Sequence, residues 1–230
     1  MINDSAFGRL NAALLVGAFG AAMAAASPAN ALLMISVDDG VSSSVFIDNV
    51  GADLDNRLGV LGINTSNGNF SLVFSLAQSQ PFIGSPTDPI VDLTFAVTSF
   101  NGGGTLTVSI TNTDFQGSGT NVGICEIGGI TGGTVDYACF FDDSNTAFAQ
   151  TEQIAGLGPF SGGVFAEAAS GAFDVNGLYS LTDVLTITHG GGTVMTTGNS
   201  NIRIPEPQTL AIFATGLAGL GFMMRRRRST

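Results

Sequence analysis

Short runs of alternating apolar and polar residues recur along this chain, and they constrain its fold more than any other feature. Residues 69–76 read NFSLVFSL, residues 105–111 read TLTVSIT, and residues 179–188 read YSLTDVLTIT. A period of two places every second side chain on one face of an extended segment, so each run predicts a half-buried β-strand. Further runs, some of them weaker, predict strands at residues 32–37, 41–47, 58–63, 92–98, 134–141 and 163–168.

Turn-forming residues separate these runs. They are concentrated at residues 64–69, 79–89, 101–104 and 117–123, and the chain has 32 glycines and no lysine. Regular spacing of strands and turns without a long helical pattern predicts a mainly β fold, an antiparallel β-sandwich. We expect residues 32–204 to form this one domain, with a short helix only at residues 143–157.

The N-terminal segment has the pattern of a secretory signal peptide. Arg9 and the α-amino group are positive, residues 10–26 are apolar except for Asn11, and Ala29-Asn30-Ala31 supplies a small-x-small cleavage pattern. We therefore predict that residues 1–31 are a signal helix, cleaved after Ala31. An alanine-rich core helix is the alternative interpretation.

The C-terminal segment has the pattern of a short membrane span. Residues 209–224 are 16 residues without a formal charge, and a helix of that length is roughly 24 Å long. This is short of the ~20 residues of a usual span, so it suits a thin or locally deformed bilayer. The arginines that follow would stay in the cytoplasm and place the body outside; they are Arg225, Arg226, Arg227 and Arg228. We predict a transmembrane helix at 208–224 and a basic cytoplasmic tail at 225–230. An amphipathic or core helix is disfavoured because residues 210–224 have no polar face.

A short motif precedes this apolar segment: Pro205, Glu206 and Pro207. The order of Pro-Glu-Pro, apolar helix and arginine cluster resembles the PEP-CTERM sorting signal of Gram-negative bacteria. The resemblance covers residues 205–230 and implies that an exosortase, an integral-membrane protease-like enzyme, recognises and cuts the tail. Such tails are also described as the C-terminal region of ice-binding proteins, a label that belongs to the tail alone. The body looks like the β-rich bodies that often precede such tails, for which no activity is known.

The charge of the exported part excludes nucleic acid as a partner. Between the predicted signal peptide and the arginine cluster lie 17 acidic side chains and two arginines, Arg57 and Arg203, a formal charge of −15. Phosphate backbones are bound by clustered cations, which this part of the chain lacks. Cations, cationic surfaces and neutral polysaccharides are electrostatically compatible.

Two cysteines, Cys125 and Cys139, fall in the exported part, where disulfides persist. We predict a disulfide between them, which would close a loop of ~15 residues and stabilise the fold by roughly 3 kcal/mol. Two buried free thiols are the alternative. A metal site is disfavoured because the chain has no CxxC pair and its one histidine is 50 positions away.

No catalytic site is predicted. His189 begins an HGGG run that is similar to the oxyanion loop of some esterases, but the chain has neither a GxSxG elbow nor a second histidine. We interpret the run as a strand end followed by a glycine turn. Paired carboxylates for glycoside hydrolysis cannot be distinguished among so many acids.

Three clusters of acids on predicted turns offer oxygen ligands for calcium, although none has EF-hand spacing. Solvated loop charge is the first interpretation and calcium the second, so no cofactor is predicted. The clusters are Asp38 and Asp39 with Asp48, Asp53 with Asp55 and Asn56, and Asp142 and Asp143 with Asn145.

Sugar-binding modules usually present exposed aromatic side chains, whereas this chain has no tryptophan, two tyrosines, and 17 phenylalanines mostly at inward positions. Threonine-rich stretches could form a flat hydroxyl face, but ice binding would require a regular repeat, and the sequence has none.

The sequence therefore predicts an exported, non-enzymatic surface or extracellular-matrix protein associated with exopolysaccharide or biofilm. The alternative is a secreted calcium- or carbohydrate-binding β-sandwich module. The expected partners are signal peptidase, exosortase, the inner membrane before processing, and exopolysaccharide. The C-terminal helix would hold the protein in the membrane until processing sends it to the cell surface or the medium.

Overall fold

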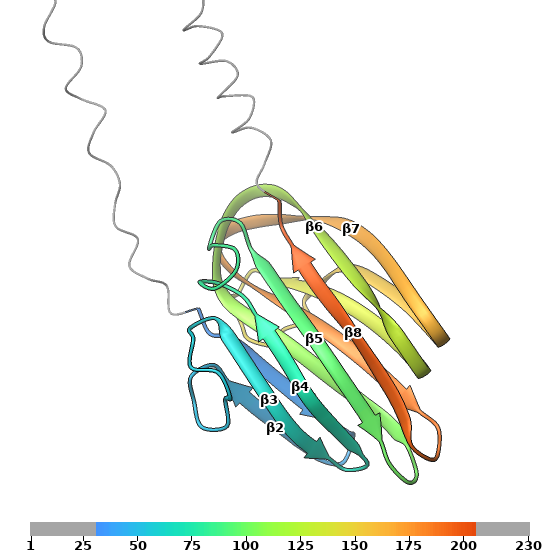
Figure 1. The fold of residues 1–230 in the computed structure, drawn as a ribbon. Helices are drawn as coiled ribbons and strands as arrows, with labels where there is room; N and C mark the ends of the chain where they lie inside the picture. The colour runs from blue at the N-terminus through green and yellow to red at the C-terminus, as the bar shows by residue number, and fades with distance from the viewer. Residues whose placement is uncertain (1–30, 206–230) are drawn as a thin grey trace, which may run out of the picture.

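A computed structural model describes residues 31–205 of the chain, and every regular element in this range is a β-strand (Figure 1). The prediction of a mainly β, antiparallel fold is confirmed. The predicted signal helix and transmembrane helix lie outside the described residues. The strands are β1 (Met34–Asp38), β2 (Ser43–Ile47), β3 (Val60–Asn67), β4 (Phe70–Gln78), β5 (Ile90–Ser99), β6 (Gly104–Asp142), β7 (Glu152–His189) and β8 (Val194–Arg203).

Two very long strands, β6 and β7, pair with each other along their whole length and pass from one group of strands to another. The first layer consists of β3, β4, β5 and β8, then residues 124–131 of β6 and 163–170 of β7. The second layer consists of β2, β1 and residues 104–112 of β6, then 181–189 of β7, 134–142 of β6 and 152–161 of β7. Figure 1 shows the first layer facing the viewer, with β6 and β7 arching over the top to join the two layers.

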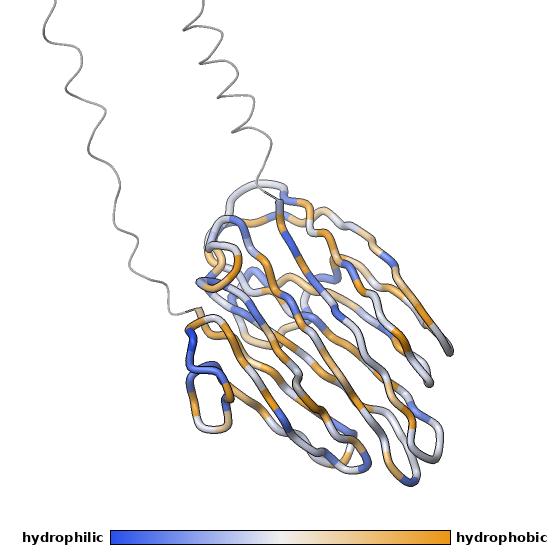
Figure 2. Tube along the Cα trace, in the orientation of Figure 1, coloured by the Kyte–Doolittle hydropathy of each residue, from blue (hydrophilic) through white to orange (hydrophobic). Residues whose placement is uncertain are grey.

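The core contains the inward side chains of both layers in one cluster. Leu93, Phe95 and Val97 of β5 are buried, and so are Leu106 and Val108 of β6. Figure 2 shows hydrophobic and hydrophilic residues alternating along these strands. The alternation seen in the sequence is therefore the alternation between the core and the solvent.

Some predicted boundaries are wrong. Residues 117–123 belong to β6 and are not a turn, and residues 143–157 are a turn followed by the start of β7 and not a helix. Glycines explain the first error, because Gly123 and Gly171 pair across the arch where a side chain would collide with Ile154. Glycine usually favours turns, but in this arch it permits two paired strands to bend closely over the core.

The strand that ends the described body, β8, was not predicted. It reads VMTTGNSNIR, with polar residues at both inward and outward positions. Thr196 and Ser200 are buried although they are polar. Within residues 31–205 we find no helix with the length and apolar character that crossing a membrane requires.

Candidate functional site

The predicted sorting motif follows directly from β8, an interior strand of the first layer. Arg203 is the last residue of β8 and is in register with Ile90 of β5 and Ile124 of β6. The next residue, Ile204, is buried, and its backbone N–H donates to the carbonyl of Pro89 at 3.0 Å. The chain is therefore fixed to the body up to the residue before Pro205.

Pro205 itself is exposed, whereas Glu206, Pro207 and the arginines at 225–228 lie outside the described residues. The Arg203 guanidinium is paired with the Glu126 carboxylate, Nη2 to Oε1 at 3.2 Å, on the outer surface. This pair has about half of each side chain exposed, so it contributes little to stability. The Arg203–Glu126 pair therefore lies on the outer surface of the first layer, two residues before Pro205.

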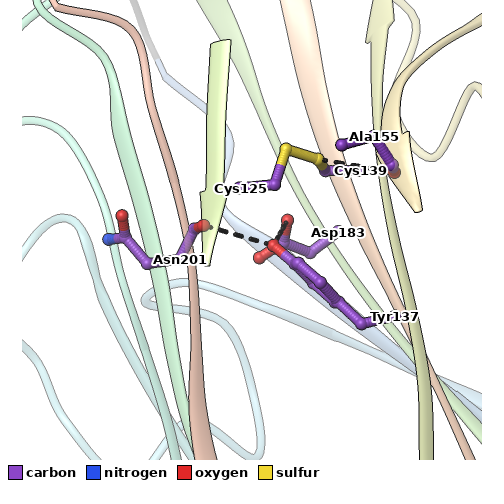
Figure 3. The surroundings of a disulfide bond; sticks show 6 residues. All are labelled: Cys125, Tyr137, Cys139, Ala155, Asp183 and Asn201. Carbon is purple, nitrogen blue, oxygen red and sulfur yellow. Dashed lines mark hydrogen bonds between the residues drawn. A yellow bond between two sulfur atoms is a disulfide. The ribbon is translucent and has the colours of Figure 1, made fainter. Parts of the chain in front are cut away.

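The two predicted disulfide cysteines lie in different layers and are joined in the structure (Figure 3). Cys125 is in register with Ile202 of β8, and Cys139 with Asp183 and Ala155 of β7. Both sulfurs are buried, and the two Cα atoms are 6.5 Å apart. The disulfide therefore links the two layers through the core.

Tyr137 makes a second link beside the disulfide. Its hydroxyl donates to Asp183 Oδ1 at 2.7 Å within the second layer, and it lies 3.3 Å from the carbonyl oxygen of Asn201 in the first (Figure 3). Burial raises the pKa of the Asp183 carboxyl well above its ordinary value, and burial together with the nearby Asp183 raises the pKa of the Tyr137 hydroxyl. The geometry suits a protonated, uncharged Asp183, because a buried carboxylate without a cation would be very costly.

His189 is buried and makes contacts within the fold. It is the last residue of β7; its Nε2 lies 2.7 Å from the Thr196 hydroxyl and its ring packs 5.7 Å from that of Phe70. Burial lowers the pKa of the imidazole. The glycine run after it connects β7 to β8, as the interpretation of a strand end and glycine turn predicts.

The acidic clusters cap turns. Asp39 accepts from the N–H groups of Val41 and Ser42, and Asp53 accepts from those of Asn49, Asp55 and Gly62. Asp48 accepts from Gly59, and Asp55 pairs with Arg57, whose hydrogen bonds lower the Asp55 pKa to about 2. Asp142 accepts from Ser144, Thr146 and Thr151. Among residues 31–205, no group of three or more acidic, histidine or cysteine side chains is arranged to hold a metal ion.

A hollow of about 300 Å³ lies on the outer face of the second layer, where three neighbouring segments of β6 and β7 meet. Ala138 and Gly156 are cross-strand partners at its centre. Phe140 and Gln153 are partners at one end, and Asp136 and Thr186 are partners at the other. We name this feature the outer hollow.

Sequence reasoning missed the outer hollow because it assigned the phenylalanines to the core. A signal was present: with Val135, Tyr137, Cys139 and Phe141 facing inward, the alternation requires Phe140 to face outward. The threonine-rich stretches also meet on this outer face. Thr188 is in register with both Thr105 and Thr134, and its hydroxyl lies 3.0 Å from that of Thr105.

Comparisons with solved structures give weak likenesses. The enzymatically active domain of tailspike protein 4 of bacteriophage CBA120 overlaps 59% of this chain at 13% identity with a TM-score of 0.33, and this chain spans only 19% of that protein. The CBM22-1 xylan-binding domain of Paenibacillus barcinonensis Xyn10C overlaps 65% of this chain and 88% of its own length, at 10% identity and a TM-score of 0.30. At such TM-scores the likeness implies neither a shared fold nor a shared ligand. No curated protein matches the chain.

One family model does match: that of the PEP-CTERM protein-sorting motif, over residues 203–228. The match begins at the last residue of β8 and includes Pro205, Glu206, Pro207 and the arginine cluster. The resemblance read from the sequence is thereby confirmed. The chain therefore carries a PEP-CTERM protein-sorting motif at residues 203–228, attached directly to a β-rich body.

Proposed function

We propose that this protein is an exported, non-enzymatic component of the cell surface or extracellular matrix, delivered by an exosortase and associated with exopolysaccharide. The observation that carries the proposal is the sorting motif at residues 203–228. In this proposal residues 1–31 are a signal peptide, residues 32–204 a β-sandwich body, and residues 205–230 the sorting tail. The tail combines the motif at 205–207, a transmembrane helix at 208–224 and a basic cytoplasmic end at 225–230.

The environment of the body residues supports a non-enzymatic role. The chain has one histidine, and its ring is buried against Thr196 and Phe70. Asp183 is buried, and three half-buried acids at the turns, Asp39, Asp53 and Asp55, are engaged by backbone N–H groups or by Arg57. A general base requires a site that substrate can reach, which these groups do not offer.

The sorting proposal is tested by changing the motif without changing the body. Pro205→Ala with Pro207→Ala should leave the C-terminal segment attached, so the protein stays in the membrane fraction of its host. The measurement is an immunoblot of membrane, surface and medium fractions, combined with the mass of the isolated protein. Pro86→Ala, in an exposed loop of the body, is the matched control and should be processed as the unchanged protein is.

Normal processing and release of the Pro205→Ala, Pro207→Ala variant would contradict the sorting proposal. A thermal melt of the same variant checks that the body is intact. Because Pro205 is exposed and follows the last anchored residue, we expect its melting temperature to be unchanged.

A second candidate function is a secreted carbohydrate-binding module, and the outer hollow is the observation that favours it. The calcium-binding form of that alternative has no such support, because the turn carboxylates of the described body serve as caps for backbone N–H groups. The two functions are compatible, since a matrix protein delivered by sorting can also hold polysaccharide.

A further inference from the structure

The outer hollow combines the groups that bind a sugar ring, and we propose that it binds a short stretch of an uncharged hexopyranose glycan. This inference rests on the proposed function, because a body displayed outside the cell meets polysaccharide there. It assigns a ligand class to a surface of the body that the sorting motif does not involve.

The shape of the hollow follows from small residues between larger ones. Ala138 and Gly156 form its floor, with Val184 beside Ala138 on the next segment. Its lining runs from Asp136 to Phe140 along β6, roughly 14 Å at ~3.4 Å per residue, and across three neighbouring segments, roughly 10 Å at ~4.8 Å per spacing. This gives a shallow, open trough that suits a chain of sugar rings lying along the surface.

Two glycines, Gly156 and Gly158, shape this floor. A Cβ atom at Gly156 would lie 2.5 Å from Gln153 Nε2, so any side chain there would displace the Gln153 amide. Gly158 has a positive φ of 102°, and a Cβ atom there would lie 2.8 Å from the carbonyl oxygen of Val135. Both positions keep the floor low and the end groups in place.

The lining supplies both kinds of contact that a pyranose ring makes. The Phe140 ring is half-buried and offers an apolar surface to the C–H groups of a sugar. The Asp136 carboxylate, the Gln153 amide and the Thr186 hydroxyl can accept from or donate to sugar hydroxyls. Within the described body, none of these three side chains makes a hydrogen bond to another residue, so their polar atoms are free for a ligand.

Charge selects the class of glycan. The lining contains no arginine or histidine, and Asp136 is negative. Residues 32–204 contain 16 acidic side chains against Arg57 and Arg203, a formal charge of −14. Both arginines are paired, with Asp55 and Glu126. An acidic glycan such as a polyuronate would be repelled, and an uncharged one would not.

The test is calorimetric titration of the full chain in detergent with cellotetraose, mannotetraose and isomaltotetraose, and with tetragalacturonate as the acidic comparison. We expect at least one uncharged tetrasaccharide to bind and the galacturonate not to bind. Ala138→Leu, which fills the floor, should weaken binding at least tenfold, and Phe140→Ala should weaken it about tenfold. The matched controls are Ala166→Leu, exposed on the other layer, and Phe100→Ala, exposed after β5; both should bind as the unchanged protein does.

Absence of binding by all three uncharged probes at millimolar concentration would overturn the inference, and so would undiminished binding by Ala138→Leu with an unchanged melting temperature. Stronger binding of galacturonate would also overturn it. The two proposals fail separately. Loss of glycan binding in a protein that is still sorted contradicts this inference alone, whereas failed sorting of a protein that binds glycan contradicts the sorting proposal alone.

Discussion

Asp183 is a carboxyl group buried in the interior, and its hydrogen bond comes from Tyr137. Its second oxygen, Oδ2, has no hydrogen-bond partner among the described residues. The raised pKa of this carboxyl means that the folded state binds a proton that the unfolded chain releases at neutral pH. The contribution of Asp183 to stability is therefore largest in acid and is lost as the pH rises above the ordinary carboxyl range.

Asp183→Asn should remove this dependence, because an amide has the shape of the protonated acid and needs no proton. We expect the variant to have a higher free energy of unfolding than the unchanged protein at pH 7.5. The difference should shrink toward pH 4, where the unfolded chain also holds its proton. Urea unfolding at the two pH values measures it. Equal midpoints at pH 7.5 would contradict a neutral Asp183.

The contribution of His189 to stability changes with pH in the opposite direction to that of Asp183. Burial lowers the His189 pKa, so the folded state disfavours the proton that an unfolded histidine takes up near pH 6.5. Stability that is present above this pH is lost as the pH falls through the ordinary histidine range toward the lowered value. Between pH 7.5 and pH 5.5 this effect opposes that of Asp183, so it is measured in the Asp183→Asn variant, whose melting temperature should fall over this range.

Adding His189→Gln to the Asp183→Asn variant should flatten this part of the pH profile, while costing about 1 kcal/mol at pH 7.5 through the lost fit to Thr196. Differential scanning calorimetry across the range measures both effects. A double variant with the same slope as Asp183→Asn alone would show that another group titrates there.

The elements of this fold show which parts of a β structure are readable from sequence. Strands with one apolar and one polar face, such as β4 and β5, are predicted nearly to the residue. The outward position of Phe140 could have been read from the same alternation. By contrast, β8 buries Thr196 and Ser200, and the arch of β6 and β7 contains glycine pairs, so both lack the apolar signal. The alternation of apolar and polar residues in a strand predicts which of its side chains are buried. It does not predict which strands, distant in the sequence, pair with one another.

The disulfide is the strongest covalent constraint on the elements, because it joins a first-layer segment of β6 to a second-layer segment of the same strand. Cys125→Ala with Cys139→Ala should lower the free energy of unfolding by about 3 kcal/mol, the loss expected when a loop of this length is opened. The sequence separation is 14 residues. The measurement is urea unfolding with and without a phosphine reductant. The unchanged protein should respond to the reductant and the double variant should not; an equal response from both would mean that the bond does not support the fold.

At the scale of the whole molecule, the body and the sorting motif share one strand. Ile202 and Ile204 are buried in the core, so the folded body needs the chain up to Ile204. In our proposal the mature protein lacks about 31 residues at its N-terminus, as expected of a signal segment, and lacks the arginine cluster, and because Ile204 is buried in the body it retains Ile204. Intact-mass spectrometry of the protein from its host measures all three. A mass that includes residues 225–230 would instead mean that the tail is a permanent anchor.

The interior position of β8 also sets an order of events during export. If the chain is exported from its N-terminus, as we propose, β5 and residues 124–131 of β6 reach the far side of the membrane while the place between them is still empty. The first layer can close only when β8 arrives, and the sorting motif follows within two residues of that strand. In the proposed export route, completion of the fold and delivery of the motif to the membrane would be nearly simultaneous, so any body released by cleavage of the tail would already contain its last strand.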